Sequence, residues 1–142
     1  MAIYSLGVLT TGTANATAAW EIRTTSTDRS ALLELGFFLN AATASIVGFG
    51  RPAAIGVTPT SPVTFVAEDS AAPAGTVTSA LAWGTGPTVP ANFNRRVGIG
   101  ATIGNGIIWT FPRGYIIPVS SSVVLWNAQL NSALNAYAVE DE

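Results

Sequence analysis

Carboxylates are the residues of this chain best suited to acid–base chemistry, because the sequence contains no histidine and no cysteine. Without histidine, neither a Ser–His–Asp nucleophile nor an imidazole metal ligand can form. Without cysteine, there is no thiol nucleophile and no cysteine-based zinc site. Lysine is also missing, which excludes a Schiff base and a P-loop.

Glu21 and Glu34 are the candidates for a pair of catalytic carboxylates, the arrangement that glycosidases use. Each lies inside an alternating, strand-like pattern. The alternative is that each lies on a solvated or interface face and pairs with a nearby arginine. We favour this alternative, and we therefore expect a protein that is not an enzyme and has no catalytic residue.

Two other stretches contain residues that ligand sites use. Glu68 and Asp69 could bind calcium, but the further oxygen ligands of a calcium loop are missing, so we interpret them as a solvated loop. VGIGATIGNGIIW (97–109) is glycine-rich, but no helix pattern follows it, as a dinucleotide site requires. We expect its glycines to relieve crowding at a bend, with Asn105-Gly106 as a hairpin turn. The sequence therefore predicts no metal and no cofactor.

The composition indicates a folded protein of unusually low charge. Charged residues make up 10% of the chain, against about 25% in an average domain. The net charge of −2 gives no footprint for nucleic acid. The sequence contains no run of 18 apolar residues, so we expect neither a membrane-spanning helix nor a membrane partner. The start of the chain lacks the features of a signal peptide, and the length favours one domain.

Short stretches of alternating apolar and polar residues recur along the chain, separated by glycine and proline. This spacing is typical of an all-β sandwich or barrel. The stretch 31–40 could also form a helix, but Gly36 and the alternation favour a strand. The proline-rich stretches 51–62 and 84–93 should form stiff, extended connections. Strands are expected at 3–8, 18–24, 31–40, 43–49, 63–67, 75–83, 94–99, 106–111, 115–119, 122–130 and 133–140.

These patterns predict an all-β fold: a single-domain antiparallel β-sandwich with jelly-roll (Greek key) topology and little or no helix. The long connections suit a jelly roll better than a simple meander. The sandwich should occupy residues 18–142. Residues 1–17 should form either its first strand or an N-terminal arm that reaches a neighbouring subunit.

Aromatic residues exceed what a core of this size needs, and IIWTFPRGYIIPVSSSVVLWN (107–127) is apolar on both strand faces. Aromatic residues and arginine are enriched at protein interfaces, where lysine is depleted. All six basic residues of this chain are arginines. We therefore predict that four aromatic residues supply both core and intersubunit contacts, with three arginines at the rims: Trp109, Phe111, Tyr115 and Trp126, and Arg95, Arg96 and Arg113.

The run ALAWGTGPTVPANFNRRVGIGATIGNGIIWTFPRGYIIPVSSSVVLWN, followed by SALNAYAVEDE, resembles small structural proteins of tailed bacteriophages. RPAAIGVTPTSPVTF is similar to the same group, so the resemblance covers the chain from about residue 30 onward. It implies a virion component with a jelly-roll or tumour-necrosis-factor-like sandwich.

Such proteins serve as capsid decoration (cement) proteins, often homotrimers, that stabilise the capsid by binding the major capsid protein on its outer surface. The resemblance supplies no catalytic residues. The alternative is a phage tail or receptor-binding component, a similar trimeric sandwich that binds carbohydrate. Trp83 and Glu68 would then be loop residues of the binding site.

Overall fold

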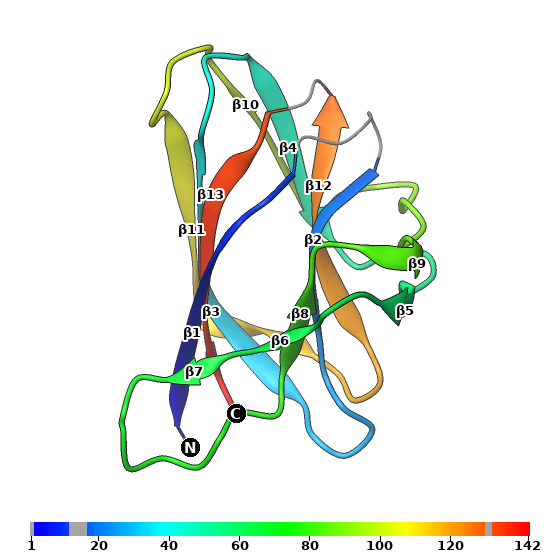
Figure 1. Ribbon diagram of the computed structural model, residues 1–142, viewed down its shortest axis with the longest axis vertical. Helices are drawn as coiled ribbons and strands as arrows, with labels where there is room; N and C mark the ends of the chain where they lie inside the picture. The colour runs from blue at the N-terminus through cyan, green and yellow to red at the C-terminus, as the bar shows by residue number, and fades with distance from the viewer. Residues whose placement is uncertain (1, 12–16, 130–131) are drawn as a thin grey trace.

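The protein is built from β-strands, and the described residues contain no helix (Figure 1). The computed structural model describes residues 2–11, 17–129 and 132–142. It confirms the all-β prediction. The strands are β1 (Ile3–Leu9), β2 (Thr17–Arg23), β3 (Ser30–Leu39), β4 (Ser45–Gly50), β5 (Val57–Pro59), β6 (Val63–Thr64), β7 (Val66–Ala67), β8 (Thr78–Ala80), β9 (Trp83–Thr85), β10 (Arg95–Ile99), β11 (Gly106–Ile117), β12 (Ser122–Gln129) and β13 (Leu134–Asp141).

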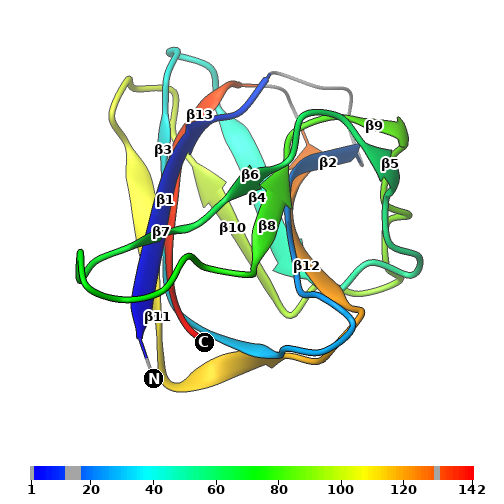
Figure 2. The same ribbon diagram turned by 60° about the horizontal axis from the view of Figure 1, so that its bottom comes forward.

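The strands form an antiparallel sandwich of two large sheets, seen face to face in Figures 1 and 2. Sheet A has the order β11-β3-β13-β1-β7, and sheet B has the order β10-β4-β12-β2-β8-β6. Strands β5 and β9 pair separately. The core between the sheets is apolar, and its largest completely buried side chains include Trp20, Phe37, Phe49, Leu32 and Leu35.

The stretch 31–40 is a strand, as its alternation predicts, but one residue interrupts the alternation. Glu34 pairs with Val139 and Leu32 pairs with Glu140, so Leu33 is an extra residue on β3. Such a β-bulge reverses the faces of the residues that precede it. Leu32 is therefore buried in the core, and Leu33 does not share the core face of Leu35, Phe37 and Leu39, where uninterrupted alternation would place it.

The predicted strands 106–111 and 115–119 form one long strand, β11, with an irregularity between Thr110 and Tyr115. Pro112 and Gly114 both lie inside this irregularity, and Gly114 has a positive φ of 69°. Proline cannot donate to a neighbouring strand, and β11 tolerates it because it is the edge strand of sheet A.

The predicted hairpin at Asn105-Gly106 is wrong. Strand β10 pairs with β4 in sheet B, whereas β11 pairs with β3 in sheet A, so the segment between them crosses from one sheet to the other. The glycines do make a turn, because Gly104 has φ +85°. Gly106 has no room for a side chain, since a Cβ would lie 2.1 Å from the carbonyl oxygen of Phe37.

The connection 51–94 between β4 and β10 covers the outer face of sheet B. It contains the short strands β5 to β9 as well as the expected extended segments. Trp83 and Phe93 from this connection pack on a second buried cluster of Ala18, Val124 and Trp126. Both faces of β12 are therefore covered by the chain itself.

The start of the chain is an interior strand of sheet A. Strand β1 pairs with β13 along its whole length and with β7 on its other side. Tyr4 on β1 is 2% exposed and belongs to the core. Residues 1–17 were expected to form either the first strand or an arm. Residues 3–9 form the first strand, β1, and residues 1 and 12–16 lie outside the described residues.

Candidate functional site

Glu21 is completely buried and holds the connection 51–94 against sheet B. One carboxylate oxygen accepts hydrogen bonds from the Gly56 amide at 3.1 Å and the Ser122 hydroxyl at 2.7 Å. The other accepts from the Trp83 indole at 2.7 Å and from Arg23 at 3.2 Å. Gly56 fits because it has no side chain, since a Cβ would lie 2.4 Å from the Trp83 ring.

This arrangement makes Glu21 a structural carboxylate. Its side chain has 0% exposure, and each of its oxygens accepts two hydrogen bonds, so neither is open to a substrate. A buried charge is tolerated only when it is paired and hydrogen-bonded in this way. The expectation that Glu21 pairs with a nearby arginine is confirmed for Arg23, but the expectation that it lies on a solvated or interface face is wrong, because Glu21 is completely buried.

Glu34 lies in sheet A, whereas Glu21 lies in sheet B, so the fold assigns the two candidate carboxylates to different sheets. Glu34 accepts a hydrogen bond from the Tyr137 hydroxyl. That hydrogen bond, with burial as the second cause, raises the pKa of Tyr137 to about 12. The Tyr137 hydroxyl therefore stays protonated and donates a hydrogen bond to the Glu34 carboxylate on the outer side of sheet A.

Glu68 and Asp69 are exposed, and each has a local structural contact. The Glu68 amide donates to the Ile3 carbonyl at 2.9 Å, and an Asp69 carboxylate oxygen accepts from the Ala71 amide at 2.9 Å. Across residues 2–11, 17–129 and 132–142, no group of three carboxylates is arranged to hold a metal ion.

Three of the predicted interface aromatics close one side of the sandwich. Trp109, Phe111 and Tyr115 of β11 point inward and contact the ring of Phe49, at centroid distances of 5.1–6.0 Å. Arg95 lies over the Phe111 ring, 4.3 Å from its centroid, as in a cation–π contact. These side chains pack on the core, and Phe111 retains only 7% exposure.

The other predicted interface residues are divided between core and surface. Trp126 has 0% exposure beneath the connection 51–94, so its ring offers no surface to a partner; it is a core residue. Arg96 and Arg113 are exposed. The intersubunit contacts of the other six residues stay a prediction: Trp109, Phe111, Tyr115, Arg95, Arg96 and Arg113.

An apolar surface that the described chain leaves uncovered lies on the other side of β11, on the outer face of sheet A. Along β1, β3, β11 and β13, every second side chain points into the core, and the side chains between them point outward. We call these outward side chains, together with Val66 of the neighbouring strand β7, the apolar outer face. Its exposed aliphatic members have 37–64% exposure, and its apolar side chains are Ile3, Leu9, Phe38, Val66, Ile108, Ile116, Tyr137 and Val139.

Strand register places these side chains in rows across the sheet. One row runs Leu9, Asn135, Phe38, and the next includes Tyr137 and Ile108 on either side of Gly36. The Tyr137 ring lies over Gly36, where a Cβ would come within 2.2 Å of it. A shallow hollow of about 390 Å³ lies beside this ring, next to Leu9 and Phe38.

The apolar outer face carries little charge. The outward positions of β1, β3 and β13 hold two carboxylates, Glu34 and Asp141, and no arginine. Glu34 is bonded to Tyr137, and Asp141 lies at the end of the face. The aromatic residues Trp109 and Tyr115, which were predicted to lie at an interface, point into the core, and the alternation of β11 exposes their neighbours Ile108 and Ile116 instead.

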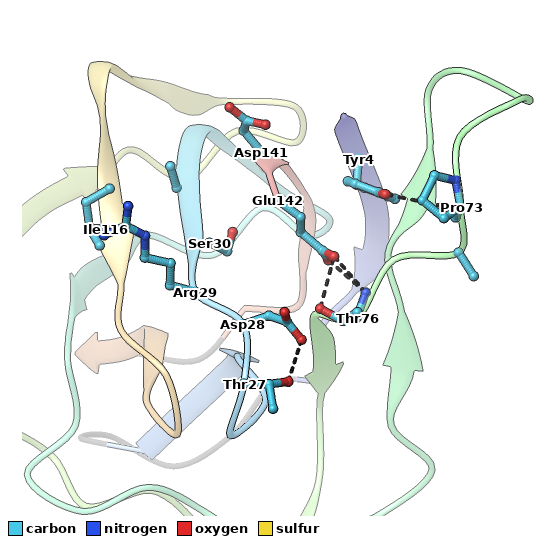
Figure 3. A pocket seen from close by; sticks show the side chains of 12 residues that line it. Tyr4, Thr27, Asp28, Arg29, Ser30, Pro73, Thr76, Ile116, Asp141 and Glu142 are labelled. Carbon is cyan, nitrogen blue, oxygen red and sulfur yellow. Dashed lines mark hydrogen bonds between the residues drawn. The ribbon is translucent and has the colours of Figure 1, made fainter. Parts of the chain in front are cut away.

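A second hollow, of about 700 Å³, opens at the end of the sandwich where β13 ends. Figure 3 shows Glu142 reaching Thr76 from one wall, with Asp28 and Arg29 on another. Glu140 lies on β13 next to this hollow, completely buried, and its carboxyl accepts a hydrogen bond from the Ser30 hydroxyl. The acidic residues 140–142 would be expected to be solvated from their charge alone, but both glutamates among them have structural contacts.

No family model, curated protein or solved structure matches this chain. Within the described ranges, no helix is long and apolar enough to cross a membrane. Inferences about function therefore rest on the residues of the chain and their geometry.

Proposed function

We propose that the protein is a non-enzymatic structural subunit that assembles into a homotrimer through the apolar outer face of sheet A. One observation carries the proposal: sheet B is covered by the connection 51–94, whereas the outer face of sheet A is apolar and uncovered within the described chain. Contiguous exposed apolar surface of this kind marks interaction sites in soluble proteins.

The occupant that fits this face is a second copy of the chain. A charged partner would find no arginine on β1, β3 or β13 and a single exposed arginine, Arg113, on β11, whereas an identical apolar face is complementary in character. Four long strands spaced about 4.8 Å apart, with about seven residues of about 3.4 Å rise, give a face of roughly 20 by 24 Å. Its planar area, about 480 Å², is about three-fifths of one partner's share of a standard interface, about 800 Å².

The order of the longer strands supports the finer assignment to a jelly roll. The eight longer strands, β1 to β4 and β10 to β13, can be renumbered 1 to 8 in chain order. Sheet A then has the order 6-3-8-1, and sheet B has the order 5-4-7-2. Two interlocked Greek keys produce this strand order, and viral capsid and lectin domains use such double-sheet jelly rolls.

We further propose that the assembled subunit is a capsid decoration protein of a tailed bacteriophage, bound to the major capsid protein on the outer surface of the virion. This step is supported by the resemblance of the chain from about residue 30 onward and by the jelly-roll strand order. The carbohydrate-binding alternative has less support, because the Trp83 indole is hydrogen-bonded to Glu21.

The first test compares two isoleucine variants by analytical ultracentrifugation. Ile108→Glu places a charge on the apolar outer face, whereas Ile103→Glu places it in the loop between β10 and β11, where Ile103 is 68% exposed. We expect trimers for the wild type and Ile103→Glu, and monomers for Ile108→Glu. A monomeric wild type at high concentration, or identical behaviour of the two variants, would refute self-association through this face.

The second test addresses the virion. Wild-type protein is incubated with phage heads that lack it, and the heads are sedimented. We expect wild-type protein and Ile103→Glu to sediment with the heads, and heads carrying the protein to resist heating better than bare heads. Absence of binding by the trimeric wild type would refute the capsid assignment and leave self-association intact.

A further inference from the structure

The C-terminal residue Glu142 clamps the two sheets together at one end of the sandwich. Its carboxylate accepts hydrogen bonds from the Thr76 amide at 2.8–2.9 Å, the Thr76 hydroxyl at 3.0 Å and the Val77 amide at 2.8 Å. Glu142 follows β13 of sheet A, and Thr76 and Val77 lead into β8 of sheet B (Figure 3). We call this set of contacts the Glu142 clamp.

Glu140 lies two residues earlier and is completely buried. In the strand register it lies opposite Tyr4 of β1 and Leu32 of β3. One of its carboxyl oxygens accepts from the Ser30 hydroxyl, and the other has no hydrogen-bond partner. An ionised carboxylate in such a place would be strongly disfavoured, whereas a protonated carboxyl is tolerated.

The groups around Glu140 add to this preference for the neutral form. Glu142 and Asp141 on its own strand contribute negative charge, and Tyr4 of β1 presents a phenol whose own pKa is raised by burial. Asp28 and Arg29, from the turn before β3, line the neighbouring hollow. Arg29 forms no ion pair with Glu140 within the described chain.

Burial is the main reason that the pKa of Glu140 is raised to about 8. The Ser30 hydrogen bond opposes this shift, and the charge of Glu142 adds to it. The carboxyl therefore holds its proton at neutral pH and loses it in mildly alkaline solution.

We propose that loss of the proton from Glu140 opens the Glu142 clamp and frees the segment before β8 from the end of sheet A. Two carboxylates two residues apart on one side of a strand repel each other when both are ionised. Glu140 is enclosed, whereas Glu142 borders the hollow, so Glu142 is the group that moves into solvent. This proton-controlled clamp does not depend on the proposed function.

Amide hydrogen exchange of Thr76 and Val77 tests the clamp directly. Exchange is measured by NMR near pH 6.5 and near pH 9, and protection factors are calculated against the intrinsic rates at each pH. We expect protection of both amides in the wild type to fall by at least roughly tenfold at the higher pH, one unit above the raised pKa. In Glu140→Gln, which mimics the neutral acid, protection should be the same at both values.

Two controls separate the clamp from general loosening. Glu142→Gln should lower the protection of Thr76 and Val77 at both pH values, and the exposed Glu68→Gln should behave as the wild type. Equal protection of the wild type at both pH values, or an identical fall in Glu140→Gln, would overturn the proposal. If Glu140→Gln does not fold, carboxyl carbon-13 titration of the wild type decides: titration of Glu140 near its ordinary pKa of 4.5 would overturn it.

Discussion

Replacing Glu21 by glutamine tests how much the buried carboxylate stabilises the sandwich. In the wild type, its two oxygens accept from Gly56, Ser122, Trp83 and Arg23. Glutamine keeps one accepting oxygen, but its amide NH₂ replaces the other and faces the groups that donated to that oxygen. The substitution also leaves Arg23 without its ion pair. Removing one partner of a buried ion pair costs roughly 3–5 kcal/mol, and we expect a loss of that size.

Urea unfolding of Glu21→Gln, followed by tryptophan fluorescence, measures this loss. In thermal unfolding, a domain of this length loses roughly 2–4 °C of Tm per kcal/mol of stability, so the Tm of Glu21→Gln should lie about 10 °C below that of the wild type. Trp83 also loses a hydrogen-bond acceptor, so native-state fluorescence should change. The control is Glu68→Gln, on an exposed side chain, with an expected effect within about 0.5 kcal/mol. A loss below about 1 kcal/mol for Glu21→Gln would refute the structural role derived for this carboxylate.

Four further changes have defined outcomes. Trp126→Ala should lower the free energy of unfolding by about 3–5 kcal/mol, because the ring fills the second core; a urea midpoint near that of the wild type would contradict this. Deleting residues 2–9 should abolish the folded state in circular dichroism, because β1 is an interior strand of sheet A; a folded product would show a dispensable arm. Gly36→Ala should displace the Tyr137 ring, so ultraviolet titration should find the pKa of Tyr137 below its wild-type value of about 12. Between pH 4.5 and about 8, stability should fall as the pH rises, by at most roughly 1.4 kcal/mol per unit, because folded Glu140 keeps a proton that the unfolded chain has lost; urea midpoints that stay level over this range would contradict it.

Alternation and turn residues predicted the long strands of the sandwich, but they divided β11 into two strands and did not predict the short pair β5 and β9. The stretch 31–40 is a strand because Gly36 and the period of two outweigh its helix-forming leucines. The one-residue bulge at Leu33 was not predictable, because a bulge depends on the partner strand β13 and not on local pattern. The hairpin at Asn105-Gly106 failed for a similar reason: its flanking strands belong to different sheets.

The candidate surface was only partly predictable. The excess of aromatic residues indicated a second apolar surface to be covered, but the connection 51–94 covers part of it, with Trp83 and Phe93 packed around Trp126. Aromatic type was therefore a weaker guide than position in the strand. On β11, the outward Ile108 and Ile116 are the exposed residues.

Coverage of sheet B by residues 51–94 limits the size of the proposed assembly. A sandwich with two bare apolar sheets would bind a neighbour on each side and form an open-ended stack, as in fibrous aggregates. Here residues 51–94 pack on the outer face of sheet B, so in the proposed assembly only the outer face of sheet A meets another copy. Two different parts of that face, in contact around a threefold axis, close a ring at three copies, and within the described chain no second bare sheet is left for further growth.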